Sequence, residues 1–343
     1  MAHRLNRDVI PHKGPGSPGL NTSHPPIRAE GEGPSTPSSR FCYRAHGLTI
    51  ISDLACPELS PWPGGTPPHD VLTIRTGKLP ESASLRADGR NRCQVGPRRL
   101  LLWFQGLGGY LALNGTTIVV DPLNDGDAAE FRAYLLGMVL GAILHQRGVM
   151  VLHGSAVQTP VGTVVFVADS GVGKSTLAVA MHQAGYPLLT DDLCTVRTDD
   201  EGGLGVAPGL QRVKLEPKTA ARLGLDVATG MSLGRIQNKA LFPLTSALTS
   251  RRPAWSPLAA IYKLDKGPVD RPQKVRLDVQ DAYQTLILNT YRREWVDRMG
   301  LETQIFRSIA LLIERIPVYR LVRPDAGMEM DALVRRIEED WRV

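Results

Sequence analysis

The stretch of this chain that most constrains its fold is an apolar, β-branched run followed directly by a glycine-containing turn and a series of good helix formers. The run Val164–Val167 predicts a buried strand, the turn is Ala168-Asp-Ser-Gly-Val-Gly-Lys-Ser175, and a helix is expected from Thr176. In this order, glycines let backbone N–H groups surround phosphate oxygens, and the helix N-terminus adds the positive end of its dipole. The sequence therefore predicts a phosphate-binding loop in an α/β protein.

The residue types in the turn indicate how a nucleotide and its metal would be held. Lys174 is expected to reach the β- and γ-phosphates of ATP, and the Ser175 hydroxyl to ligate Mg²⁺. The usual motif begins with glycine, whereas Ala168 takes that place here. A chance Gly-Lys-Ser in a surface turn is the alternative, and the flanking strand and helix favour the phosphate-binding interpretation. The predicted nucleotide-binding residues of the loop are Ser170, Gly171, Val172, Gly173, Lys174, Ser175 and Thr176.

Length and composition place the chain among ordinary globular proteins. Its 343 residues suit one large domain or two, with 42% hydrophobic and 22% charged residues. The net charge of +6 comes without a dense Lys/Arg run interleaved with aromatics, so we expect no nucleic-acid partner. The longest apolar run, Ala133–Leu144, is too short to span a bilayer, and residues 1–40 lack a signal peptide's apolar region. The four cysteines show no C-x-x-C spacing, which favours reduced thiols in a cytoplasmic protein.

Changes in composition along the chain predict three parts. Residues 1–40 are rich in Pro, Gly and Ser and are expected to be a disordered tail. Residues 41–125 contain short alternating segments and are expected to form a small β-rich domain. Residues 126–343 carry the phosphate-binding motif and are expected to form an α/β domain. The predicted strands of the β-rich part are Gly47–Ser52, Asp70–Arg75, Arg99–Phe104, Gly109–Asn114 and Thr116–Asp121.

Two adjacent carboxylates, Asp191 and Asp192, are expected to close the apolar strand that follows the loop helix. One helix and one strand separate Lys174 from Asp191, which predicts that both motifs meet at one edge of the sheet. One carboxylate can hold Mg²⁺ directly or through water, and the other can accept the proton of an attacking hydroxyl. An exposed turn after the strand is the alternative.

Three further predictions concern basic groups. His153 lies in Leu152-His-Gly-Ser, and a hairpin into the next strand would return it toward the phosphates; a packed or solvated histidine is the alternative. Arg292 follows a predicted helix over Asp278–Asn289 and could stabilise charge on a transferring phosphoryl group, or simply be solvated. Arg212 and Lys214 alternate with apolar residues, so they share one strand face that either binds an anion or faces solvent.

The three motifs together resemble a known family. Leu152-His-Gly-Ser155, the loop Ala168–Ser175 and Leu188-Leu-Thr-Asp-Asp192 are similar to the catalytic domain of bacterial HPr kinase/phosphorylase. They are more similar still to HPr-kinase-like enzymes found beside lasso-peptide biosynthesis genes. The resemblance covers about residues 126–343, and Tyr43-Arg-Ala-His-Gly-Leu also resembles the front half of such relatives.

The resemblance implies a fold, an activity and residue roles. The fold implied is a P-loop catalytic domain related to phosphoenolpyruvate carboxykinase. Asp192 would be the general base, Asp191 a metal-side residue, His153 a histidine near the phosphates, and Lys239 a residue near nucleotide or substrate. Thr176 stands where the family usually has Glu, and the family's glycine-rich signature downstream is not recognisable; Glu201-Gly-Gly-Leu-Gly-Val predicts a hairpin turn instead.

The function predicted is therefore an ATP- and Mg²⁺-dependent serine kinase acting on a peptide or protein, with a lasso-peptide precursor as one candidate acceptor. A kinase of a small molecule such as free serine, and a nucleotide-binding regulatory module without transfer chemistry, are the alternatives. A carboxykinase-like reaction is a weaker one, because no clear set of oxaloacetate-binding arginines is visible. The oligomeric state is left open.

Overall fold

The computed structural model contains three β-sheets and the helices that pack on them. The structure describes residues 40–64, 70–123, 129–199, 201–232, 238–244, 255–325 and 330–341. The predicted tail, apart from Arg40, and the predicted domain boundary at residue 125 lie outside these residues. No helix in the described part of the chain is long and apolar enough to cross a membrane.

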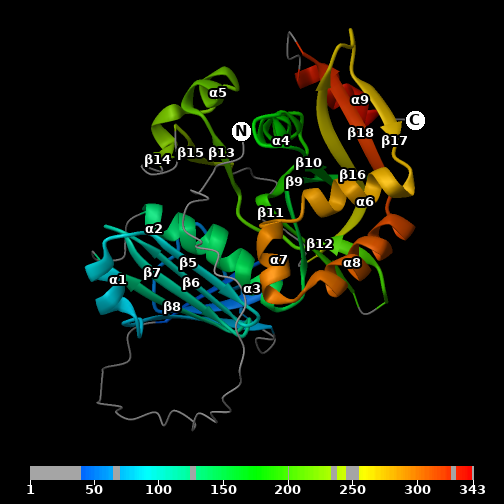
Figure 1. Cartoon of the computed structure of the whole chain (residues 1–343). Helices are drawn as coiled ribbons and strands as arrows, with labels where there is room; N and C mark the ends of the chain where they lie inside the picture. Colours follow the sequence, from blue (N-terminus) through cyan, green and yellow to red (C-terminus); the bar gives the residue numbers. More distant parts are fainter. Residues whose placement is uncertain are drawn as a thin grey trace. The chain divides into compact units, whose positions relative to one another are not determined.

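The first sheet has eight strands in the order β3-β1-β2-β4-β8-β7-β6-β5 (Figure 1). The five strands expected between residues 47 and 121 are all confirmed to within a residue or two. Three strands of this sheet and the short helix α1 (Ser82–Asp88) were not predicted. The strands are β1 (Phe41–Ala45), β2 (Leu48–Ser52), β3 (Ser60–Pro61), β4 (Val71–Thr76), β5 (Arg92–Gly96), β6 (Arg99–Phe104), β7 (Gly108–Leu113) and β8 (Thr117–Pro122).

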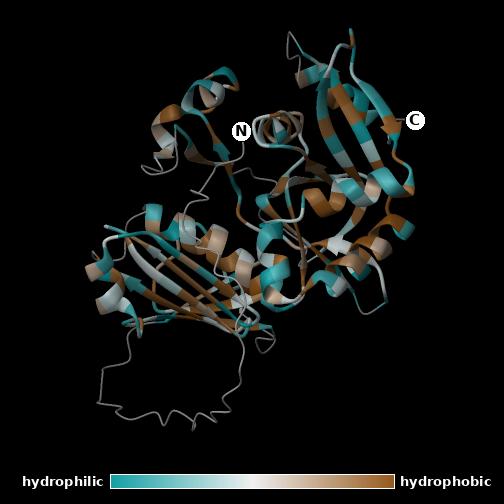
Figure 2. Cartoon of the chain, viewed as in Figure 1, coloured by the Kyte–Doolittle hydropathy of each residue, from teal (hydrophilic) through white to brown (hydrophobic). Residues whose placement is uncertain are grey.

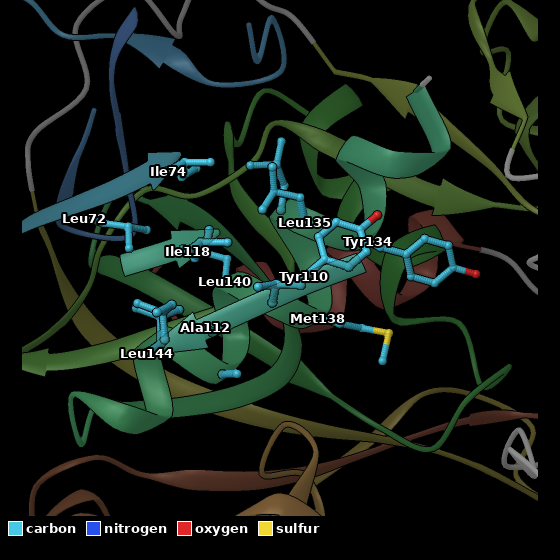
Figure 3. Close-up of a cluster of buried hydrophobic side chains, with 14 of the residues drawn as sticks. Leu72, Ile74, Tyr110, Ala112, Ile118, Tyr134, Leu135, Met138, Leu140 and Leu144 are labelled. Carbon is cyan, nitrogen blue, oxygen red and sulfur yellow. The ribbon is translucent and has the colours of Figure 1, made fainter. Parts of the chain in front are cut away.

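A helical segment packs its apolar side chains on this sheet. The spacing of apolar residues over 127–147 predicts a single helix, but the structure has α2 (Ala129–Tyr134), a π-helical turn η1 (Leu135–Val139) and α3 (Leu140–Gln146) there. Figure 3 shows the side chains of this segment meeting those of β4, β7 and β8 in one buried cluster. A π-turn widens the helix by one residue per turn and is frequent at functional sites, and this one faces the carboxylate pair described below.

The second sheet carries the phosphate-binding motif. Its strands run in the order β10-β9-β11-β12-β16-β18-β17, and β16 also pairs with β10, so that β10, β9, β11, β12 and β16 are joined in a ring. Figure 2 shows hydrophobic residues in the central strands of this sheet and a largely hydrophilic outer strand β17, which agrees with the exposure of β17. The strands are β9 (Met150–Thr159), β10 (Gly162–Val167), β11 (Leu188–Thr198), β12 (Leu204–Val206), β16 (Ser256–Gly267), β17 (Gln273–Arg276) and β18 (Val318–Pro324).

The helices of this part agree with the sequence pattern except for one. The helices expected from Thr176 and over Asp278–Asn289 are confirmed, and the apolar spacing near residues 302–313 and 330–341 also predicts the helices found there; α7 was not predicted. The loop helix begins at Lys174, two residues earlier than expected. The helices are α4 (Lys174–Gln183), α6 (Val279–Leu288), α7 (Arg293–Met299), α8 (Glu302–Arg315) and α9 (Met330–Glu338).

A small third sheet has the strand order β13-β15-β14. Its strand β13 contacts α4 and β11. The sequence from Glu216 to Leu223 predicts a helix, and the structure has α5 (Pro217–Arg222) there, with the 3₁₀ turn η2 (Val227–Thr229) after it. The hairpin expected around Glu201 is confirmed, because β12 pairs antiparallel with β11 across it. The strands are β13 (Arg212–Leu215), β14 (Met231–Ser232) and β15 (Ala240–Pro243).

Candidate functional site

The loop between β10 and α4 has the backbone shape that its glycines allow. Gly171 and Gly173 have φ angles of +84° and +120°, which favour glycine over other residues. A Cβ on Gly171 would meet no atom within 4 Å, so the backbone there is open to a ligand. Arg323 of β18, almost completely buried, donates from Nε and Nη2 to the carbonyl oxygen of Val172 at 3.2 Å. Arg323 thus holds the loop at Val172, while the backbone at Gly171 stays accessible to a ligand.

Lys174 is folded back against this loop. Its Nζ donates to the carbonyl oxygen of Ala168 at 2.6 Å, and the side chain is buried. Burial lowers the pKa of Lys174, and the charges of Asp191 and Asp192 act in the opposite direction. The amine is therefore close to both carboxylates and to the loop carbonyls at once.

Ser175 and Asp191 meet as the sequence predicted. The Ser175 hydroxyl lies 3.1 Å from each carboxylate oxygen of Asp191, and the buried Ser155 hydroxyl of β9 donates to Asp191 Oδ1 at 2.5 Å. Burial raises the pKa of the Asp191 carboxyl, since hydrogen bonds offset only part of the cost of removing a charge from water. Ser155 was not predicted as a site residue, although it lies in the quoted motif around His153.

The expectation that the carboxylate pair closes its strand is wrong. β11 continues to Thr198, and Asp192 lies inside it, opposite Gly154 of β9. Asp192 has a φ of +73°, which is unusual for a residue other than glycine. This backbone conformation interrupts the regular alternation of side chains between the two faces of the sheet. An acidic pair resembles a turn in sequence, and only the pairing with β9 shows that the strand passes through it. The backbone strain is located at the predicted base.

His153 and Asp192 form a pair across the two strands. His153 Nδ1 lies 3.0 Å from Asp192 Oδ1, and both side chains are more than a third exposed. Burial acts to raise the pKa of Asp192, but the hydrogen bond and charge of His153, with the charges of Lys214 and Arg292, hold it below its usual range. Asp192 therefore remains ionised in the free protein and is available to accept a hydrogen bond.

Arg292 approaches the same carboxylate from the connection between α6 and α7. It has a φ of +46° and lies over the Trp295 ring, with its guanidinium carbon 5.4 Å from the ring centroid. The backbone beside it is attached to β9, because the N–H of Tyr291 donates to the carbonyl oxygen of Val151 at 2.8 Å. Arg292 is thus held beside Asp192 in a strained backbone conformation. It is not simply a solvated side chain at the end of α6.

Lys214 of β13 and Lys239, which directly precedes β15, complete the cationic surroundings. The backbone N–H of Lys214 donates to Asp191 Oδ2 at 3.2 Å. Burial lowers the pKa of Lys214, Asp192 acts to raise it, and the charge of Lys239 lowers it further. Lys239 also lowers the pKa of Lys174, so the predicted residue Lys239 lies within electrostatic reach of the loop. Arg212, on the same face of β13 as Lys214, is close enough to Asp192 for the carboxylate to affect its pKa.

A buried histidine of the first sheet supports the strand that holds the carboxylates. His46, in the turn between β1 and β2, is fully buried, and its backbone N–H donates to the carbonyl oxygen of Pro208 at 2.7 Å. Its Nδ1 lies 3.5 Å from the hydroxyl of Thr195 in β11, and a Cβ on Gly209 would clash with the ring at 2.3 Å. The sequence indicated only an ordinary packed or surface histidine. The only sequence signal of its position is the His-Gly turn.

Burial of His46 predicts a pH-dependent stability. Burial, with the charge of Arg197, lowers its pKa from 6.5 to about 4, while Asp192 acts to raise it. Between these pH values His46 is protonated in the unfolded chain and neutral in the folded protein. The free energy of unfolding therefore falls as the pH drops from 6.5 to 4. The loss from this group is about 3 kcal/mol. Urea unfolding at pH 7 and pH 4 is expected to show a smaller loss in His46→Asn, which tolerates positive φ; an equal loss in both proteins would contradict the assignment.

The oxygen ligands present fit a magnesium ion. Ser175 Oγ and the Asp191 carboxylate are hard donors held 3.1 Å apart, and Mg²⁺ is commonly bound by one or two such groups together with substrate phosphates. The described residues contain no group of three His, Cys, Asp or Glu side chains that could hold a metal by themselves. The four cysteines are all free thiols.

Comparisons with known proteins agree with the motifs. No family model matches the chain. HPr kinase/phosphorylase from three strains of Clostridium perfringens is 26% identical over 189 residues, which cover 55% of this chain and 54% of each relative. The chain thus matches about half the length of these curated relatives.

A solved structure of the Hpr(Ser) kinase/phosphatase from Coxiella burnetii matches with a TM-score of 0.29 and 13% identity, covering 55% of this chain and 95% of that one. At this TM-score the superposition adds no argument to the sequence similarity. The sequence similarity to HPr kinase/phosphorylase therefore extends over about half of this chain.

Proposed function

We propose that the chain is an ATP-dependent kinase that transfers the γ-phosphoryl group to a serine hydroxyl of a peptide or protein. The observation that carries the proposal is the junction at Asp191: the loop serine Ser175 touches its carboxylate, and the next residue, Asp192, is a partly exposed, ionised acid. This arrangement supports nucleotide binding and proton acceptance at adjacent residues of one strand. The similarity to HPr kinase/phosphorylase supports the same reaction class.

In the proposed reaction, the loop amides and Lys174 hold the phosphates of ATP. The oxygen of the acceptor hydroxyl forms a bond to the γ-phosphorus, and Asp192 accepts the proton of that hydroxyl. At the same time the bond between the γ-phosphorus and the β–γ bridging oxygen breaks. The phosphorylated acceptor and ADP are the products. Bound Mg²⁺, held by Ser175 and Asp191, would neutralise charge on the phosphate oxygens. Arg292 lies beside Asp192 and would stabilise charge on the transferring group.

The test is incubation of the full chain with ATP, Mg²⁺ and a panel of serine-containing peptides, followed by mass spectrometry and an ADP assay. We expect a mass gain of one phosphoryl group on serine that depends on Mg²⁺. Nucleotide binding without ADP release or phosphopeptide would favour a regulatory module and contradict the kinase proposal. The panel includes a lasso-peptide precursor and HPr, since the comparisons do not identify the acceptor.

The position of His153 leads to a separate prediction. His153 Nδ1 holds Asp192 Oδ1, so His153→Ala removes a contact that orients the base. We expect kcat to fall about tenfold or more, the scale of a lost hydrogen bond to a charged group, with little change in KM for ATP. Steady-state ADP release is the measurement. His182→Ala is the histidine control, because His182 lies at the far end of α4. A rise in KM for ATP with kcat unchanged would place His153 at the nucleotide instead.

A further inference from the structure

A small pocket adjoins the proposed base, Asp192. It has a volume of about 40 Å³, enough for one small group. Apolar groups from the π-turn, β11 and β15 form part of its wall, and charged groups of β11 and β13 form the rest. We call it the β13 cavity; it is lined by Ala133, Leu136, Gly137, Asp191, Asp192, Leu193, Leu210, Arg212, Lys214 and Leu241.

One carboxylate oxygen of Asp192 is left for a ligand on this side. Oδ1 is held by His153 at 3.0 Å, whereas Oδ2 makes no hydrogen bond within the described part of the chain. A Cβ on Gly137 would lie 3.9 Å from Oδ2, so the π-turn places a residue without a side chain opposite this oxygen. A small hydroxymethyl group can therefore reach Oδ2 between the π-turn and β13.

The opposite wall carries a positive charge with an incomplete set of partners. The side chain of Arg212 is 11% exposed, and its Nη1 has no hydrogen-bond partner among the described residues. Its nearest carboxylate oxygen, Glu58 Oε1, is 3.9 Å away and already accepts from Arg132 Nε at 2.8 Å. Lys214 lies on the same face of β13, so two half-buried cations share the wall with Asp192. A cation held largely out of water with an incomplete set of partners favours an anionic ligand.

We infer that the β13 cavity receives the acceptor hydroxyl and that the acceptor carries an acidic group, a carboxylate, next to that hydroxyl, which binds Arg212 and Lys214. This inference rests on the proposed kinase function and adds the chemical class of the acceptor to it. The carboxylate can belong to a free hydroxy acid such as serine or to a residue beside the serine of a peptide.

The test uses two pairs of acceptors that differ only in the acid. The peptide pair has Asp or Asn next to a serine, and the small pair is L-serine and L-serinamide. Binding of labelled peptide is measured by fluorescence anisotropy with a non-hydrolysable ATP analogue and Mg²⁺, and the small molecules are measured by competition. We expect the acidic member of at least one pair to bind about tenfold tighter, and this preference to be lost in Arg212→Gln. Preference in only one pair identifies the source of the carboxylate.

Control variants separate this effect from unfolding and from general charge. Arg222→Gln removes an exposed arginine of α5 and should keep the preference. Arg212→Lys should retain part of it. Gly137→Leu should fill the cavity and abolish acceptor binding while nucleotide binding is kept. An equal affinity for acid and amide in the wild-type protein, or a preference that survives Arg212→Gln, would overturn the inference.

Binding and transfer fail independently. An Arg212-dependent preference without any phosphoryl transfer would sink the kinase proposal and leave the acceptor cavity standing. Phosphoryl transfer to acid and amide acceptors at the same kcat/KM would contradict the inference about the acceptor carboxylate and leave the kinase proposal standing.

Discussion

Asp192→Asn is expected to lower kcat by at least about 100-fold while leaving nucleotide affinity nearly unchanged. A positioned general base contributes about 10²–10⁴ to a rate, and an amide in place of the carboxylate cannot accept the proton. Asp192 is ionised in the free protein because its pKa is held low, and its carboxylate lines the β13 cavity with Oδ2 toward Gly137. Phosphopeptide formation by mass spectrometry and nucleotide binding by calorimetry are the two measurements.

The control for this variant is Asp270→Asn, since Asp270 is exposed. Its turnover should equal that of the wild-type protein. Near-normal turnover of Asp192→Asn would assign the base to another group, and Asp191→Asn would then distinguish the two carboxylates. Because Asp191 contacts the loop serine, its loss should raise the Mg²⁺ concentration needed for half-maximal activity.

Lys174→Ala is expected to weaken nucleotide binding about 10- to 100-fold and to remove measurable transfer. A hydrogen bond to a charged group contributes about 1.5–3 kcal/mol, and Lys174 is the predicted cation for the β- and γ-phosphates. Its pKa is lowered by burial, but the nearby carboxylates favour the charged form that phosphate requires. Titration with a fluorescent ATP analogue measures the effect.

Two controls accompany Lys174→Ala. Lys218→Ala removes an exposed lysine of α5 and should bind nucleotide normally. A thermal melt of Lys174→Ala is needed because Nζ also donates to the carbonyl of Ala168, and losing that contact affects the loop itself. Unchanged affinity in a folded Lys174→Ala would show that the loop does not hold the triphosphate.

Local pattern was sufficient for most elements because each repeats along a short stretch of chain. Alternation located five strands of the first sheet, and the β-branched run with its glycines located β10 and α4. Elements without a clean period were missed, such as α7 and the edge strand β5. The helix over 127–147 was predicted as regular because its apolar face conceals the π-turn at Leu135–Val139.

The candidate site was predictable in its residue types and not in its connections. The motif of loop, histidine and paired acids is visible in sequence, and the chemical requirements of phosphate and Mg²⁺ explain those residue types. The contacts of Ser155 with Asp191, Arg323 with Val172 and His46 with the segment around Pro208 join residues far apart in the chain. No local pattern encodes such contacts, because they depend on strand order and register.

The sequence by itself determined that a strand, a phosphate-type loop and a helix follow one another, with two acids one helix and one strand later. The tertiary structure alone decided that β11 passes through the acids, with Asp192 at a φ of +73°. It also decided that the oxygen of Asp192 left free by His153 faces Gly137 and the cations of β13. The physical reason is that backbone preferences act over a few residues, whereas the direction of a strained side chain is set by packing between distant elements.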